Sequence, residues 1–317
     1  MNQKAYIIAV DVGGTYTRIG LCETSGAVVA KKKFLTAKLE GKDDPLLQLS
    51  ALIRQLKPKD GRVIGISVGL PALVDKLNDS TYEACALRKI KGYDIRSYLE
   101  ASFGVPVFVG NDAKLAALGE HRYGAGRGSS TMLFLTISTG IGGAVILNKE
   151  LVKGARGFAG EAGVCFFADP EWKDNVAVKP LESIASGSAI AERAVSLLRQ
   201  GRSSRITDLV NGNMNKVTAK IVSRVAKRGD PLANEVFQAA GFYIGLALVN
   251  LIHLLNPDRV VLGGGVMKAG NIIFKPIKET VAKYAMPATL MGLKIVRGAL
   301  GDNAGLLGGL VFALNYL

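Results

Sequence analysis

Residues that build metal and disulfide sites are scarce in this sequence. Its 317 residues include three cysteines, Cys22, Cys85 and Cys165, and two histidines, His121 and His253. Three scattered cysteines form no disulfide framework, and they are typical of a reducing cytoplasm. Without a Cys-x-x-Cys pair, and with so few histidines, the sequence argues against a zinc site. We therefore expect a cytoplasmic protein without structural zinc.

Long apolar runs are also missing. The most apolar stretch, 241–255, is interrupted by Asn250 and His253, so we expect no membrane span. The first four residues lead directly into a strand-like run and show no hydrophobic core of a secretory signal. We expect neither secretion nor a membrane partner.

Acidic residues are outnumbered, with 26 Asp and Glu against 40 Lys and Arg, which gives a formal charge of +14. Nucleic-acid binding requires a clustered basic stripe together with a recognised reading module. Here the basic residues are spread along the chain, so a solvated surface that attracts anionic substrates is favoured. Nucleic-acid binding is kept only as a minor alternative, and no nucleic-acid partner is expected.

Two glycine turns stand out among the features that are present. Asp11-Val-Gly-Gly-Thr15 and Ser138-Thr-Gly-Ile-Gly-Gly143 each lie between two apolar, strand-like runs. Glycine lets the backbone approach a ligand, and successive N–H groups in such a turn can cradle an anion. A single turn of this kind is also typical of an ordinary hairpin. Two of them, about 125 residues apart, predict two lobes that grip one polyphosphate.

The order of elements favours a two-lobed α/β protein with a cleft between the lobes. The length fits two domains, and the second half repeats the beginning of the first: a hairpin with a Gly-Thr turn, then helices and strands. Glycines at 124–128 mark the expected boundary. We predict a small lobe over 1–123, a large lobe over 124–302, and a closing helix over 303–317 that packs back onto the first lobe.

Asn111 and Asp112 follow an apolar strand and precede a helix. The simplest interpretation is a helix N-cap. The functional interpretation places the Asp112 carboxylate beside a substrate hydroxyl, because phosphoryl transfer needs an aligned nucleophile and a proton acceptor. The two phosphate-type turns favour Asp112 as the general base.

Other polar residues have two interpretations each. Asp11 suits Mg²⁺, held directly or through water, or it is a turn residue that bonds its own backbone. Glu161 lies among glycines and either bonds two hydroxyls of a ligand or is solvated, and Glu182 opens a predicted helix over 181–199. Gly187 within that helix indicates close approach of a flat group. Gly264 and Gly265 form either a wall for a nucleotide or a plain turn.

Taken together, these segments resemble the ROK family of sugar kinases and repressors, within the actin-like ATPase and hexokinase superfamily. The resemblance covers nearly the whole chain. Its motifs occur in order: the two glycine turns, Gly69-Leu-Pro71 with Val74-Asp75, Asn111-Asp112 with 116–120, Gly154 with 159–161, Leu181-Glu182 with 186–190, Asn256-Pro-Asp258 with 261–266, and 301–305.

The resemblance implies two actin-like (RNase H-like) lobes and ATP- and Mg²⁺-dependent phosphorylation of a hexose-type sugar, usually at its 6-hydroxyl. It implies Asp112 as general base, with Asn111, Glu161, Glu182 and Gly69 at the sugar. It also implies that the glycine turns hold the phosphates of ATP, through Gly13, Gly14, Thr15, Thr139 and Gly140. Gly187, Gly264 and Gly265 would lie at the rest of the nucleotide. Family members often form homodimers.

This sequence departs from the pattern of typical family members at four places. Val164 replaces the zinc-binding histidine and the cysteine motif is missing, which implies a zinc-free branch. Its sugar loop is then expected to be held by packing of Phe166, Phe167 and Trp172. Ala86 and Ala72 replace an asparagine and a glycine, so the sequence does not specify which sugar, or which anomer, is used.

The alternative is a sugar-binding regulator of the same family. Family repressors carry a DNA-reading domain before the first phosphate turn, and only ten residues precede Asp11 here. We therefore expect a kinase rather than a repressor, while a binding-only protein with weak activity stays open.

Overall fold

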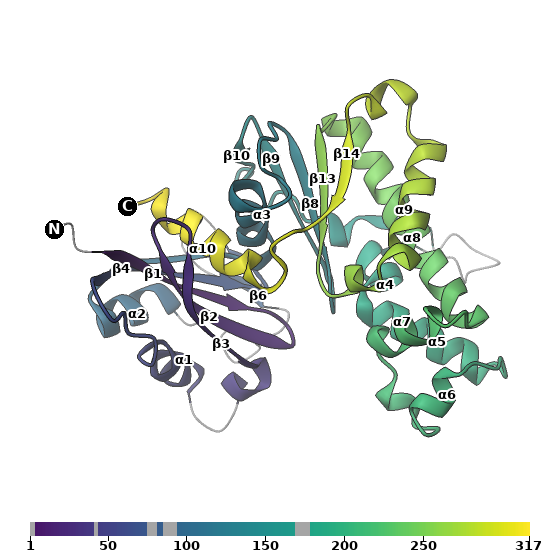
Figure 1. Ribbon diagram of the computed structural model, residues 1–317, viewed down its shortest axis with the longest axis horizontal. Coiled ribbons are helices and arrows are strands. Elements are labelled where there is room, and N and C mark those ends of the chain that lie inside the picture. Colours follow the sequence, from purple (N-terminus) through teal and green to yellow (C-terminus); the bar gives the residue numbers. More distant parts are fainter. Residues whose placement is uncertain (1–3, 41–43, 75–80, 85–93, 169–177) are drawn as a thin grey trace. The chain divides into compact units, whose positions relative to one another are not determined.

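The computed structural model describes residues 4–40, 44–74, 81–84, 94–168 and 178–317, and they form two units (Figure 1). Unit 1 consists of Met1–Ser129, Ala144–Gly160 and Gly298–Leu317, and unit 2 of Ser130–Gly143 and Glu161–Arg297. Helix α10 (Ala304–Leu314) therefore belongs to the unit that contains the N-terminus. The segment 144–160, which the prediction placed in the large lobe, also groups with unit 1.

Unit 1 is built on a five-stranded sheet of order β3-β2-β1-β4-β7. The strands are β1 (Ala5–Val12), β2 (Tyr16–Glu23), β3 (Val28–Leu35), β4 (Arg62–Leu70) and β7 (Val107–Asn111). The first three are antiparallel, whereas β1, β4 and β7 run parallel. Asp11 lies opposite Gly69 of β4, and Leu70 lies opposite Asn111 of β7. The register thus brings the predicted site residues of unit 1 to the same edge of the sheet.

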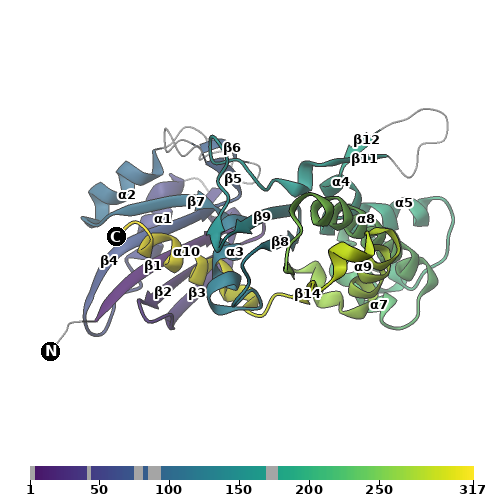
Figure 2. The ribbon, with the colours of Figure 1, turned by 90° about the horizontal axis from the view of Figure 1, so that it is seen from above.

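Side chains alternate between the two faces of β1. Ile8 and Val10 pack in a cluster with α1 (Pro45–Ile53) and α2 (Ile95–Phe103), whereas Ile7 and Ala9 pack with Leu306 and Leu310 of α10. Figures 1 and 2 show α10 on one face of this sheet and the other two helices on the opposite face. The closing helix is an integral layer of unit 1.

The second five-stranded sheet has the order β10-β9-β8-β13-β14. Strands β8 (Met132–Ile137), β13 (Arg259–Gly263) and β14 (Lys294–Arg297) run parallel, and the boundary between the units falls within β9 (Ile141–Leu147). The short β10 is Glu150–Leu151. Helices α4 (Leu181–Ala185), α5 (Gly187–Arg199), α6 (Ile206–Leu209), α7 (Ala219–Ala226), α8 (Pro231–Leu255) and α9 (Asn271–Tyr284) complete unit 2.

Helix α8 is long and apolar enough by composition to cross a membrane, as is no other helix among the described residues. Its apolar side chains, such as Phe237, Ile244 and Leu248, are buried within unit 2. Gly241 and Gly245 leave no room for a Cβ against Pro276 and Thr280 of α9, so the two helices pack closely. The length and hydropathy of α8 match its place as a core helix.

The predicted α/β class is confirmed by these two mixed sheets. One element differs: the helix expected over 181–199 is interrupted at Ser186, whose extended backbone separates α4 from α5. The Ser186 hydroxyl accepts a hydrogen bond from the Ala189 N–H and caps α5. Gly187 is therefore the first residue of a helix and not an interior one. Two short hairpins, β5–β6 (Ala72–Val74, Thr81–Ala84) and β11–β12 (Phe166–Ala168, Val178–Pro180), complete the strands.

Candidate active site

The first glycine turn connects β1 to β2, as predicted. The Gly13 N–H donates to the Tyr16 carbonyl at 3.0 Å, and the Thr36 hydroxyl donates to the Gly13 carbonyl at 2.6 Å. The Thr36 N–H also donates to the Thr15 carbonyl at 3.0 Å. Gly14 and Thr15 are exposed at the tip of this braced turn, as phosphate binding requires.

Asp11 lies beside this turn in a network of charges. Its Oδ2 is 3.4 Å from Nη1 of Arg18, whose Nη2 is 3.0 Å from Asp302 Oδ1. Lys33 Nζ is 2.8 Å from the other Asp302 oxygen. Burial raises the pKa of Asp11 to about 6 against the opposing charge of Arg18. The hydrogen bond from Lys33 leads the interactions that lower the pKa of Asp302 to about 2.

The Asp11 carboxyl also faces the first turn of α10. A Cβ built on Gly305 would lie 2.5 Å from Asp11 Cγ, so only glycine leaves the carboxyl its place. The described residues contain no group of three His, Cys, Asp or Glu side chains that could hold a metal. Mg²⁺ commonly keeps several waters and takes one or two carboxylates plus substrate phosphates. The single, partly accessible Asp11 carboxylate fits that kind of site.

Asn111 and Asp112 stand at the junction of β7 and α3 (Asp112–Tyr123). The Asn111 side chain accepts a hydrogen bond from the Lys114 N–H at 3.0 Å and donates one to the Ala72 carbonyl at 3.2 Å. The N-cap interpretation is thus confirmed for Asn111. Asp112 is the first helical residue, and its Oδ1 accepts from the Ala113 N–H at 2.8 Å. The positive end of the helix dipole favours a carboxylate at this position.

Gly69 lies next to this junction. A Cβ on Gly69 would be 3.0 Å from Leu115 Cδ1 and 3.5 Å from Asp112 Cα, so the glycine allows α3 to approach β4 closely. The structure therefore brings Asp11, Gly69, Asn111 and Asp112 to one edge of the unit 1 sheet.

The second glycine turn joins β8 to β9 and is held by backbone groups of its own unit. The Ser138 carbonyl accepts from the Gly187 N–H at 2.7 Å, and the Thr139 carbonyl accepts from the Ser188 N–H at 3.3 Å. The Ser138 hydroxyl accepts from the Gly265 N–H at 3.2 Å. Gly187 packs so closely that a Cβ would lie 2.5 Å from the Ser138 carbonyl oxygen. The flat group that Gly187 approaches is this peptide.

Glu182 and Gly264 complete the second turn. Glu182 Oε2 accepts from the Ile141 N–H at 2.8 Å and occupies the space of a Gly140 Cβ. Gly264 has a φ of +92° and lies against the Ile137 backbone. Within unit 2 the structure brings together Thr139, Gly140, Glu182, Gly187, Gly264 and Gly265.

The loop before Glu161 depends on glycine. Gly154, Gly157 and Gly160 have φ values of +72°, +98° and +91°, which side chains rarely allow. Glu161 precedes a 3₁₀ turn, η3 (Ala162–Val164), without capping it. The prediction that Phe166 packs against this loop is wrong, because Phe166 is 65% exposed. Phe167 makes an edge contact with Tyr243. Trp172 and Ala86 lie outside the described residues.

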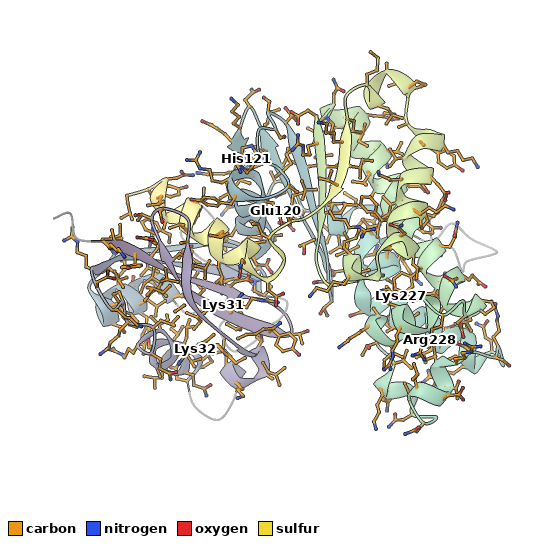
Figure 3. The ribbon with its side chains drawn as sticks, viewed as in Figure 1. Lys31, Lys32, Glu120, His121, Lys227 and Arg228 are labelled. Atoms are coloured by element: carbon orange, nitrogen blue, oxygen red, sulfur yellow. The ribbon has the colours of Figure 1, made fainter. Side chains whose placement is uncertain are left out.

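Glu120 lies in the motif segment 116–120, and no role was predicted for it. It is buried on α3 (Figure 3). Its carboxylate accepts from the N–H groups of Ala125, Ala299 and Leu300 at 2.8–3.0 Å. The next residue, His121, contacts the Ser129 carbonyl through Nε2 at 2.9 Å. A charged residue within an otherwise apolar helix face was the available signal. Lys114 is a second charged residue buried on α3, and no role was predicted for it although it gave the same signal.

The chain is similar to known sugar kinases over nearly its whole length. A glucokinase of Halalkalibacterium halodurans is 33% identical to this chain in sequence. The match covers 98% of this chain and 94% of the glucokinase. The crystal structure of a ROK family glucokinase from Streptomyces griseus, in complex with glucose and AMPPNP, is similar at a TM-score of 0.84 and 26% identity, covering 98% of this chain and 99% of that one.

Repressors are similar as well. The xylose repressor of Caldicellulosiruptor bescii is 27% identical over 95% of this chain, a match that covers 76% of the repressor. Residues 7–315 match the ROK family as a whole. The chain has the actin-like ATPase fold of these structural neighbours, and it belongs to the ROK family.

Proposed function

We propose that this protein is an ATP-dependent carbohydrate kinase that phosphorylates a hexose-type sugar, on its 6-hydroxyl, with Asp112 as general base. The observation that carries the proposal is the position of Asp112. It begins α3 at the sheet edge where the register also places Asp11, next to the exposed tip of the first glycine turn. A partly accessible carboxylate beside a phosphate-type turn suits proton removal from a sugar hydroxyl.

In the proposed reaction, the sugar hydroxyl oxygen attacks the γ-phosphorus of ATP and the bond to the β,γ-bridging oxygen breaks. Asp112 accepts the hydroxyl proton, and ADP leaves with the bridging oxygen. General-base catalysis contributes about 10²–10⁴ in rate. Mg²⁺, when bound near Asp11, supplies positive charge to the phosphate oxygens.

We assign the exposed first turn, Gly13, Gly14 and Thr15, to phosphate binding, and Thr139 and Gly140 of the second turn to the same task in unit 2. Gly187, Gly264 and Gly265 form the backbone behind the second turn and are proposed to face the nucleotide. The braced geometry of both turns supports these assignments, since a preformed turn loses little freedom on binding.

The sugar contacts are proposed to come from Asn111, Glu161, Glu182 and the close-packed Gly69. Each Asn111 amide atom already makes one hydrogen bond, and an amide oxygen accepts two while its nitrogen donates two. Glu182 supports the second turn with one oxygen and is exposed. Val164 and Ala86 stand where family members carry a polar side chain at the sugar, and Ala72 replaces a glycine. Lost polar contacts change which epimer is accepted, so we assign the sugar class and not one sugar.

The two units are proposed to be the two lobes of the kinase, acting in the cytoplasm where ATP is available, and a homodimer is the proposed assembly. Small molecules, ATP and a sugar, are the proposed partners, without nucleic acid or membrane, and we propose no zinc site.

A sugar-binding regulator with little activity is the second candidate, since repressors are among the relatives. The two candidates separate in an assay of ADP release with hexoses, pentoses and N-acetylhexosamines, in parallel with ATP binding by calorimetry. The kinase predicts sugar-dependent ADP release with at least one hexose. Nucleotide binding without turnover on any sugar would instead support the regulator.

A further inference from the structure

Helix α3, which begins with Asp112, carries a buried cation in its first turn. Lys114 is 6% exposed, and its Nζ donates a hydrogen bond to the Gly157 carbonyl. A buried lysine is costly unless it is well bonded, and the positive end of a helix disfavours a cation. Burial and the helix dipole both disfavour the Lys114 charge, which indicates that its contact has a role other than stabilising α3.

The carbonyl that Lys114 holds belongs to the loop 154–160. This loop turns through Gly154, Gly157 and Gly160, all in the left-handed region. The Ala159 N–H donates a hydrogen bond to the Lys153 carbonyl at 3.2 Å, so the two ends of the loop are joined. Three glycines in seven residues allow many backbone conformations in the absence of an external tether.

We propose that Lys114 is a positioning residue that fixes the loop 154–160 to the catalytic helix. This inference rests on the proposed function, in which the loop leads directly to the sugar-binding Glu161. Helix α3 then positions both the proposed general base, Asp112, and the loop 154–160. The expected packing by Phe166 does not occur, and the Lys114 contact supplies an anchor in its place.

The test compares Lys114→Met, which keeps most of the length of the side chain and removes its donors, with Lys114→Arg, which keeps a charged donor. Lys153→Met is the matched control, because Lys153 is an exposed lysine at the base of the same loop that bonds the Tyr316 hydroxyl. Lys114→Met is expected to raise the sugar KM about 10- to 100-fold, because a charge-assisted hydrogen bond is lost. The KM for ATP and kcat at saturating sugar should stay within about threefold, and Arg should restore most of the affinity.

Hydrogen exchange of the free protein measures the tether without any substrate. Peptides that cover 154–160 are expected to exchange at least about tenfold faster in Lys114→Met than in the wild type or in Lys153→Met. Should Lys114→Met fail to fold, Lys114→Gln carries both measurements, with a smaller increase expected in each.

Unchanged loop exchange in a folded variant would overturn the tether, whatever the enzyme phosphorylates. A large fall in kcat with an unchanged sugar KM would also overturn it, since it would show that the charge acts on Asp112. If the wild type phosphorylates no sugar while the loop still loosens in Lys114→Met, the proposed function fails and the structural tether stands.

Discussion

The two glycine turns have similar sequences but are stabilised in different ways. Each is backed by a glycine in the first turn of a helix, Gly305 of α10 for the first and Gly187 of α5 for the second. At the first turn the contact is with the half-buried Asp11 carboxyl, which depends on Arg18 for its charge balance. At the second turn the contact is between backbone groups, without a buried charge.

The two turns therefore differ in how their contacts affect ligand binding and the stability of the fold. A half-buried carboxylate with a raised pKa destabilises a fold, so its presence at the first turn is best explained by a ligand that needs negative charge, such as Mg²⁺. Backbone hydrogen bonds at the second turn stabilise the fold and hold the N–H groups in place. Substitutions should therefore affect unfolding oppositely at the two turns.

Gly187→Ala should have the largest effect. Its Cβ meets the Ser138 carbonyl oxygen at 2.5 Å, and a peptide cannot move as a flexible side chain can. Overpacking, and the displacement that weakens the bond from the residue 187 N–H to the Ser138 carbonyl, predict a loss of about 2–4 kcal/mol in the free energy of unfolding and weaker ATP binding. Urea unfolding and calorimetry measure both. Ser188→Ala, which leaves the backbone intact, is the control, and equal behaviour of the two variants would contradict the close packing.

Asp11→Asn should act in the opposite direction. Because burial raises its folded pKa to about 6, the ionised carboxylate destabilises the fold above pH 6, and this penalty disappears as the pH falls toward 4. The amide should raise the free energy of unfolding by about 1–3 kcal/mol at pH 7, while Mg²⁺-dependent turnover falls. Urea unfolding between pH 4 and 7 tests this, and a gain that is independent of pH would refute the assigned cause.

Glu182→Ala probes the carboxylate of the second turn. It removes the acceptor of the Ile141 N–H, so we expect a loss of about 1 kcal/mol in unfolding free energy. Glu182→Gln keeps an acceptor oxygen and should lose less. If sugar contact is an additional role, the sugar KM of the Gln variant rises while its stability is retained. Identical stability in both variants would argue against the hydrogen bond.

Asp302→Asn should have the smallest effect, below about 1 kcal/mol, because its ion pairs with Arg18 and Lys33 are partly exposed. The pKa of Asp302 lies below its ordinary value, so its contribution is present above about pH 4 and is lost as the pH falls toward 2. Thermal unfolding at pH 7 and pH 3, with and without 0.5 M salt, measures this. A larger effect at high salt would contradict the ion-pair account.

Much of the fold could be predicted because its signals are local. Continuous apolar runs predicted the strands, and Gly-Thr pairs predicted both hairpin turns. The break at Ser186 was missed because a continuous helical pattern hides a cap, and the cap is stabilised by a turn distant in sequence.

The candidate site could be predicted as a set of residues but not as a set of contacts. Asn111 was recognised as a cap candidate from its position between strand and helix. The partners of Lys114 and Glu120 could not be inferred, because Gly157 and Leu300 reach them only through the tertiary fold. The Arg18–Asp302 pair joins residues 284 positions apart for the same reason.

The most direct test compares Asp112→Asn with the wild type, using ATP and the best hexose of the substrate panel. The account predicts that kcat falls about 10²–10⁴-fold while ATP affinity and the melting temperature change little. Turnover within a few-fold of the wild type would contradict it.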